Sequence, residues 1–257
     1  MTTTPHGFDR WLQDTEARHL RDMTPTEVAR ALRALSATYV ERRARLSGRG
    51  AFDTAGKRAA YALYYAPRRY QMLCHILAAL PAASGALSIL DIGCGTGAAG
   101  AAWAVHAGTG ASIQAFDSHP WAVEETRLTL QAFGLRGDVR RGAIGGTPGI
   151  RPWADGRGSQ RRAILLSYMV NELTDDDRAD LLPSLLAAAA RGAHVLVMEP
   201  LSRKTSPWWA RWAEAFVSAG GRADEWRVTL DLAEITRRLG DAAGLDAAGA
   251  TGRTLYL

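Results

Sequence analysis

The chain has 257 residues, of which 47% are hydrophobic, and this content is enough for one large domain or for one domain with an extension. Two cysteines are too few for a disulfide framework, and no apolar run approaches the roughly 18 residues that span a bilayer. The first residues lack the charged-then-apolar pattern of a signal peptide. We therefore expect a soluble, reduced, cytoplasmic protein with no membrane partner.

The positive charge lies in the first third of the sequence. Residues 1–85 hold 13 Lys and Arg against 7 Asp and Glu, whereas the remainder is nearly balanced although the whole chain carries a net charge of +5. A basic region of this kind attracts a polyanion such as RNA, or it is an ordinary solvated helical face. Charge alone leaves both interpretations open.

Residues 1–85 are predicted to form a basic helical cap. A capping box that begins at Thr24, followed by apolar residues at helical spacing, predicts a helix over residues 25–46. A second helix, over residues 56–66, is expected to be interrupted at Pro67, because proline lacks the backbone N–H that a helix interior needs. A further apolar stripe at helical spacing follows it.

From residue 86 the pattern changes to short apolar strands that alternate with helices. This alternation predicts an α/β fold with a doubly wound, mostly parallel sheet over residues 86–257. Residues 142–160 contain several glycines and few apolar residues, so we expect a loop there. The expected strands are residues 87–92, 111–116, 138–141, 163–167 and 194–198, with the last strands after residue 225.

A glycine-rich turn follows the first of these strands. Residues 89–97 read ILDIGCGTG, in which three glycines alternate with small residues ahead of an alanine-rich helix candidate. Glycine permits positive φ angles and a close approach of a ligand to the main chain, and a helix N-terminus offers unpaired N–H groups. Asp117 ends the second strand, 20 residues after Gly97, where an acid can bind ribose hydroxyls. The turn therefore predicts a nucleoside cofactor.

Two cofactor classes fit such a turn, dinucleotides and S-adenosylmethionine. Dinucleotide sites favour Gly-x-Gly-x-x-Gly, because a pyrophosphate sits on the helix N-terminus, whereas here Gly97 comes one residue early. Asp91 would place a carboxylate close to that pyrophosphate, but it suits a cationic methionine group. The spacing favours S-adenosylmethionine, with S-adenosylhomocysteine as the product.

Residues 90–97, LDIGCGTG, closely resemble the first motif of class I S-adenosylmethionine-dependent methyltransferases. This resemblance implies a seven-stranded Rossmann-like sheet, with Asp117 as the ribose-binding acid. The predicted cofactor-binding residues are Asp91, Gly93, Cys94, Gly95, Gly97, Asp117, Ser118 and Ser167.

Three further blocks look like the methyltransferase-like family of mitochondrial small-ribosomal-subunit assembly factors and their bacterial relatives. They are YALYYAPRRY at residues 61–70, SYMVNEL at residues 167–173 and Glu199-Pro200. The resemblance implies binding to small-subunit ribosomal RNA, or its methylation, with the basic cap on the RNA side. The chain departs from the family in two respects: it lacks the cysteines of an iron–sulfur cluster, so we expect none, and Leu201 replaces the glycine that commonly follows Glu-Pro.

The substrate side is predicted at the ends of the fourth and fifth strands. Tyr168, Asn171 and Glu172 face the crevice where open α/β sheets bind ligands, and they are predicted to be catalytic, although a simple turn would use the same residues. Base-amine methylation is not supported, because the block lacks the Asn/Asp-Pro-Pro-Tyr/Phe pattern. The predicted substrate contacts, which combine aromatic and charged groups, are Tyr65, Arg68, Arg69 and Glu199.

Two other patterns have structural explanations. Asp175, Asp176 and Asp177 suit the positive end of a helix beginning at Thr174, so no metal site is predicted. A helix over residues 207–219, with Ser206 as its N-cap, presents an aromatic face that favours packing on the sheet. The sequence thus predicts a methyltransferase that acts on ribosomal RNA or the small ribosomal subunit. The alternatives are a small-molecule methyltransferase with a closed pocket under the cap, and a non-catalytic cofactor-binding assembly factor.

Overall fold

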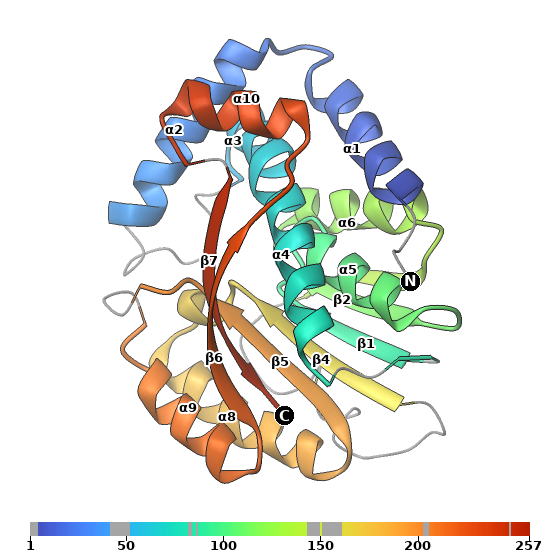
Figure 1. Cartoon of the computed structure of the whole chain (residues 1–257), viewed down its shortest axis with the longest axis vertical. Helices are drawn as coiled ribbons and strands as arrows, with labels where there is room; N and C mark the ends of the chain where they lie inside the picture. The colour runs from blue at the N-terminus through green and yellow to red at the C-terminus, as the bar shows by residue number, and fades with distance from the viewer. Residues whose placement is uncertain are drawn as a thin grey trace.

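The computed structural model describes residues 5–41, 52–81, 84–85, 87–142, 150, 161–202, 206–246 and 248–257. A seven-stranded sheet with helices on both faces forms its centre, in the strand order β3-β2-β1-β4-β5-β7-β6 (Figure 1). The strands are β1 (Leu87–Ile92), β2 (Ser112–Asp117), β3 (Arg136–Arg141), β4 (Arg161–Ser167), β5 (Ala193–Glu199), β6 (Arg222–Thr229) and β7 (Gly249–Tyr256).

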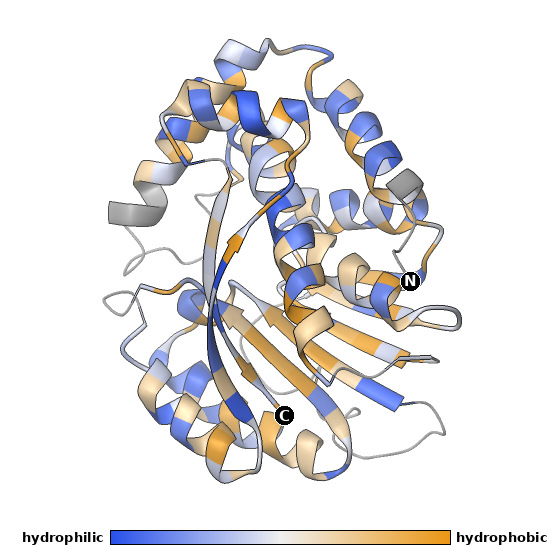
Figure 2. Ribbon diagram, viewed as in Figure 1, coloured by the Kyte–Doolittle hydropathy of each residue, from blue (hydrophilic) through white to orange (hydrophobic). Residues whose placement is uncertain are grey.

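The five neighbouring strands β3, β2, β1, β4 and β5 run parallel to one another, whereas β7 runs antiparallel to both β5 and β6. Successive residues of a strand point to opposite faces, so Ile89 and Leu165 belong to one hydrophobic cluster while Leu90 and Leu166 belong to another. The central strands are accordingly mostly hydrophobic in Figure 2, with hydrophilic segments towards their ends. The prediction of a doubly wound, mostly parallel, seven-stranded sheet is confirmed.

The helices divide between the two faces of the sheet. Helices α8 and α9 pack in one cluster, and the N-terminal helices pack with α5, α6 and α10 in the other. Because the first four helices share a core with the sheet, the domain boundary after residue 85 stays a prediction. The helices are α1 (Pro5–His19), α2 (Pro25–Glu41), α3 (Ala55–Ala60), α4 (Ala66–Ala79), α5 (Ala98–Ala107), α6 (Pro120–Ala132), α8 (Asp175–Ala190), α9 (Trp209–Ser218) and α10 (Glu234–Ala243).

The predicted interruption at Pro67 is wrong. The chain stays helical from α3 to α4 through a π-helical turn at Tyr61–Tyr65, in which the N–H of Ala66 donates to the carbonyl oxygen of Tyr61. This turn changes the backbone pairing just before Pro67, which then lies in the first turn of α4, where a missing N–H costs little. Three tyrosines, Tyr61, Tyr64 and Tyr65, belong to this turn.

Other boundaries differ by small amounts. The strands β1, β2, β4 and β5 lie within two residues of the predicted ranges, and α9 begins at Trp209 rather than at Pro207. The predicted helix beyond Glu41 and most of the predicted loop at 142–160 lie outside the described residues. None of the described helices combines the length and the apolar character that crossing a membrane requires.

Helix α1 packs on α6 through a buried carboxylate. Glu125 is 4% exposed, and its oxygens lie 2.5 Å from Nη2 of Arg18 and 3.4 Å from Nε2 of His19. Burial by itself would raise the pKa of Glu125, but the neighbouring His19 and Arg18 outweigh it and lower that pKa. The ionised form of Glu125 therefore stabilises the folded protein.

We predict that Glu125→Gln lowers the free energy of unfolding by about 1–3 kcal/mol at pH 7, because the charge-assisted contacts are lost. The pKa of Glu125 is lower in the folded state than in the unfolded state. The difference in unfolding free energy between wild type and variant is therefore fully present above the unfolded pKa of about 4.3, and it declines as the pH falls below that value. Urea unfolding at pH 7, 5 and 3.5 measures it. Glu214→Gln, at an exposed position on α9, is the control. A difference that stays constant down to pH 3.5 would contradict this account.

Candidate functional site

The glycine loop connects β1 to α5. Gly93, Gly95 and Gly97 have φ angles of +70°, +58° and +73°, in the left-handed region that other residues seldom adopt. The N–H groups of Gly93 and Cys94 donate to the carbonyl oxygen of Phe116 at 2.8 and 3.0 Å. The loop is thus attached to the end of β2 in a conformation that requires glycine.

Neighbouring side chains also leave little space for a larger residue in the loop. A Cβ atom at Gly97 would lie 2.7 Å from Cγ2 of Thr126, and one at Gly95 would lie 3.0 Å from the hydroxyl of Tyr61. The π-helical turn therefore brings an aromatic side chain directly over the middle of the loop.

Two carboxylates lie at the ends of the neighbouring strands β1 and β2. Asp117 accepts hydrogen bonds from the N–H groups of Gly95 at 2.9 Å and His119 at 2.8 Å. Asp91 is 1% exposed, and neither of its oxygens has a hydrogen-bond partner among the described residues. Burial and then the charge of Asp117 raise the pKa of Asp91 to about 7, and burial raises the pKa of Asp117. Buried acids with unused acceptor capacity suit a ligand that carries hydroxyl or cationic groups.

The other predicted cofactor residues differ in their surroundings. Ser167 ends β4, and its buried hydroxyl has no hydrogen-bond partner among the described residues. The sulfur of Cys94 lies 3.3 Å from Oγ1 of Thr126, and burial raises the pKa of this thiol, so Cys94 is a packed loop residue. Ser118 is exposed, and its carbonyl oxygen accepts from Nε of Arg141 at 3.1 Å.

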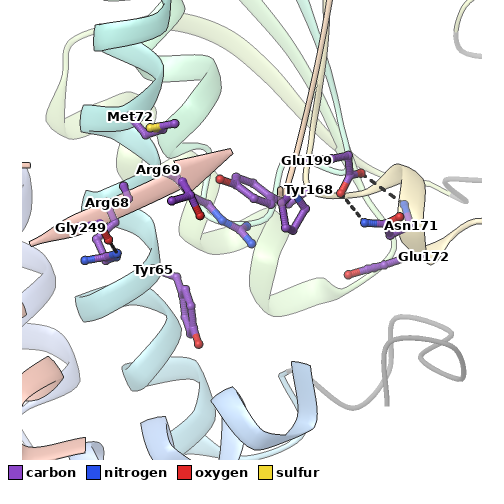
Figure 3. A pocket seen from close by; sticks show the side chains of 12 residues that line it. Tyr65, Arg68, Arg69, Met72, Tyr168, Asn171, Glu172, Glu199 and Gly249 are labelled. Atoms are coloured by element: carbon purple, nitrogen blue, oxygen red, sulfur yellow. Dashed lines mark hydrogen bonds between the residues drawn. The ribbon is translucent and has the colours of Figure 1, made fainter. Parts of the chain in front are cut away.

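A cavity of about 280 Å³ lies at the carboxyl ends of β4 and β5, between these strand ends, α4 and the start of β7 (Figure 3). The structure thus brings together side chains from four elements that are far apart in the sequence. Every residue predicted as catalytic or substrate-binding lines this cavity: Tyr65, Arg68, Arg69, Tyr168, Asn171, Glu172 and Glu199.

Glu199 holds the turn that follows β4. Its Oε1 accepts from the N–H groups of Val170 at 2.8 Å and Asn171 at 3.3 Å, and its Oε2 accepts from Nδ2 of Asn171 at 2.7 Å. Burial raises the pKa of Glu199 to about 8, although these hydrogen bonds oppose the shift. Oδ1 of Asn171 accepts from the Ser206 hydroxyl at 2.7 Å and from Nε1 of Trp208 at 2.9 Å. The side chains of Asn171 and Glu199 therefore hydrogen-bond to other parts of the protein, which favours positioning roles for both.

Arg69 links the glycine loop to the cavity. Its guanidinium carbon lies 4.7 Å from the ring centre of Tyr61 and 4.5 Å from that of Tyr168, which are cation–π distances. Tyr168 has φ of +59°, a strained conformation of the kind found at functional sites. One position earlier on α4, Nη2 of Arg68 donates to the carbonyl oxygen of Gly249 at 2.6 Å and so joins α4 to β7.

Glu172 extends from the turn after β4 into the cavity (Figure 3). By surface area the residue is exposed, although it lies in the wall of the cavity. Reduced hydration there raises the pKa of its carboxyl to about 7, although the charge of Arg69 lowers it, and Asp117 raises it further. Among the described residues, no side chain or backbone group donates a hydrogen bond to it. Of the described residues that line the cavity, Glu172 is therefore the carboxylate whose oxygens accept no hydrogen bond from the protein.

Three residues of this site were missed from the sequence. Tyr61 lies over the glycine loop, and Ser206 and Trp208 fix Asn171. Tyr61 stands in the block quoted for the family resemblance, but Ser206 was expected to cap a helix. Within the described part of the chain, no cluster of three or more His, Cys, Asp or Glu side chains is arranged to hold a metal ion.

Comparison with known families identifies the chain. Residues 55–222 match the profile of a family described as mitochondrial small ribosomal subunit Rsm22. The chain belongs to the Rsm22 family. The match runs from α3 to the start of β6 and includes the glycine loop and the turn after β4. It confirms the resemblance to small-subunit factors. A search of curated protein sequences found no significant match.

Solved structures share the fold of this Rsm22 family member. An O-methyltransferase family protein from Burkholderia thailandensis is 13% identical, with a TM-score of 0.54 over 90% of this chain and 70% of that one. A SAM-dependent methyltransferase from Aquifex aeolicus is also 13% identical, with a TM-score of 0.44 over 73% and 89% of the two chains. At 13% identity, the likeness to the Burkholderia protein shows the fold alone, which is that of class I S-adenosylmethionine-dependent methyltransferases.

We predict that Asn171→Ala lowers the free energy of unfolding by about 1–3 kcal/mol, because Glu199, Ser206 and Trp208 each lose a hydrogen-bond partner. Urea unfolding monitored by tryptophan fluorescence measures the change. The control is Ser184→Ala, which removes an exposed hydrogen bond within α8 and should leave stability unchanged. Equal effects of the two substitutions would show that the network around Asn171 does not stabilise the turn.

Proposed function

We propose that this protein is an S-adenosylmethionine-dependent methyltransferase that acts on ribosomal RNA or on the small ribosomal subunit. The observation that supports it most is the continuity between two sites. The ring of Tyr61 touches the glycine loop and also stacks on Arg69, which lines the cavity at the ends of β4 and β5. A cofactor on the loop and a substrate in the cavity would therefore be neighbours.

The residues at the ends of β1 and β2 fit the cofactor. Bound S-adenosylmethionine would supply a methyl group activated by a positively charged sulfur. Asp117 is positioned for the ribose hydroxyls, and the unpartnered oxygens of Asp91 suit the cationic methionine portion. The glycines Gly93, Gly95 and Gly97 would let the ligand approach the backbone closely.

The cavity combines aromatic and cationic groups, as expected for a nucleic acid substrate. Tyr65 and Tyr168 offer ring faces, and the guanidinium groups of Arg68 and Arg69 offer positive charge. The excess positive charge of residues 1–85 would attract the phosphate backbone. The family match adds support, since its description names the mitochondrial small ribosomal subunit.

A second candidate is an assembly factor that binds the cofactor without catalysis. The internal hydrogen bonds of Asn171 and Glu199 favour it, because these bonds use both side chains to hold the protein's own turn rather than a substrate. Calorimetric titration with S-adenosylmethionine, combined with a radiolabelled methyl assay on small-subunit particles, separates the two. Tight binding with no label transferred would support the non-catalytic role.

We predict that binding to small-subunit ribosomal RNA weakens steeply between 50 and 200 mM salt. Each phosphate contact contributes about −0.7 to −0.9 to the slope of log K against log salt concentration, so we expect a slope of about −2 or steeper. Filter binding of an RNA fragment measures the slope, and calorimetric titration of S-adenosylmethionine is the control, whose affinity should change little. A flat RNA slope would instead favour a small-molecule substrate.

We predict that Gly95→Arg abolishes binding of S-adenosylmethionine, because the new side chain meets Tyr61 and fills the space over the loop. Gly220→Arg is a matched control. Gly220 also has a positive φ, of +90°, but a Cβ there would have no neighbour within 4 Å. Both variants are strained, so a loss confined to Gly95→Arg assigns the effect to the site. Unchanged affinity in that variant would refute the assignment of the cofactor to this loop.

A further inference from the structure

The polar side chains that line the cavity differ in whether the protein already occupies their hydrogen-bond acceptors. Both oxygens of Glu199 and the oxygen of Asn171 accept hydrogen bonds from the protein. Arg68 and Arg69 are cations that donate but cannot accept a proton. Among the described lining residues, Glu172 is thus the carboxylate whose oxygens are engaged by no donor.

The surroundings of Glu172 suit a group that takes up a proton. Arg69 approaches from α4 and Asp117 from the end of β2, so one positive and one negative side chain act on it, while the neighbouring Glu199, with a pKa of about 8, is mostly protonated at neutral pH. The loss of hydration in the cavity and then the charge of Asp117 favour the protonated form, and Arg69 favours the ionised form. The balance puts the pKa of Glu172 at about 7, where both forms are populated near neutral pH.

The cavity lacks the group that methylation of a pyrimidine ring carbon requires. Such a carbon becomes nucleophilic when a thiolate adds to the ring, which is a case of covalent catalysis. The sequence has two cysteines. Cys94 is buried in the glycine loop against Thr126, and Cys74 lies on α4 in a separate groove beside β6. Neither lines the cavity, and burial raises the pKa of both thiols.

We infer that the methyl acceptor is a ring nitrogen or a hydroxyl oxygen that carries a proton, and that Glu172 is the general base that removes this proton. The inference rests on the proposed function and narrows its substrate class. The lone pair of the acceptor forms the new bond to the methyl carbon, the carbon–sulfur bond breaks with its electron pair staying on sulfur, and the N–H or O–H proton passes to an oxygen of Glu172.

The test compares Glu172→Gln with wild type on small-subunit particles. We expect kcat to fall about 100-fold or more, in the range for loss of a general base, while KM changes little. The wild-type rate should rise with pH up to about 7 and then level off, and the residual rate of Glu172→Gln should lack this dependence. Glu172→Asp, which keeps a carboxylate, should retain part of the rate, and Glu214→Gln should behave as wild type.

Two measurements do not depend on comparing rates. In ¹³C NMR of glutamate-labelled protein without added cofactor, one carboxyl signal should titrate near pH 7 and be missing in Glu172→Gln. Nuclease digestion of the labelled RNA, followed by mass spectrometry, should identify an N-methyl or O-methyl nucleoside. A C-methyl nucleoside, a Glu172 signal that titrates at the usual value near 4, or a wild-type rate in Glu172→Gln would overturn this inference alone. No label transferred by the wild-type protein would overturn the proposed function together with it.

Discussion

The carboxylate of Asp117 joins the glycine loop to the segment that follows β2. One oxygen accepts from the glycine loop at Gly95 and the other from His119, at the start of α6. Since the carbonyl oxygen of Phe116 also accepts two loop N–H groups, the end of β2 determines where the loop lies. The protein itself therefore sets the loop geometry, which is the preorganisation that tight ligand binding favours.

The helix that runs from α3 through the π-helical turn into α4 connects this loop to the cavity. Tyr61 meets Gly95 at one end, and Arg69 reaches Tyr168 two turns later. The ring of Tyr61 also stacks on Arg69, so a single side chain contacts both the loop and a residue of the cavity wall. Single π-helical turns are often found at functional sites, and here the turn brings aromatic side chains to both the glycine loop and the cavity.

Local patterns predicted much of this arrangement. The glycine spacing, the acid at Asp117 and the alternation of strands and helices are properties of short segments, so the sheet and the loop could be anticipated. The partners that are far apart in the sequence could not be predicted from such local patterns. The π-helical turn before Pro67 accompanies packing against the loop, and the hydroxyl of Ser206, a plausible helix cap by its position, donates instead to Asn171, 35 residues away. The positioning role of Glu199 likewise depends on a turn in another part of the chain.

The place of β7 has a consequence for synthesis on the ribosome. This strand comes last in sequence, yet it lies between β5 and β6, and its first residues form part of the cavity wall. While the nascent chain emerges, β5 and β6 have no partner for the edges that β7 will occupy. The wall of the cavity can be completed only after residues 249–256 have left the exit tunnel, and until then the two open strand edges are exposed to intermolecular pairing.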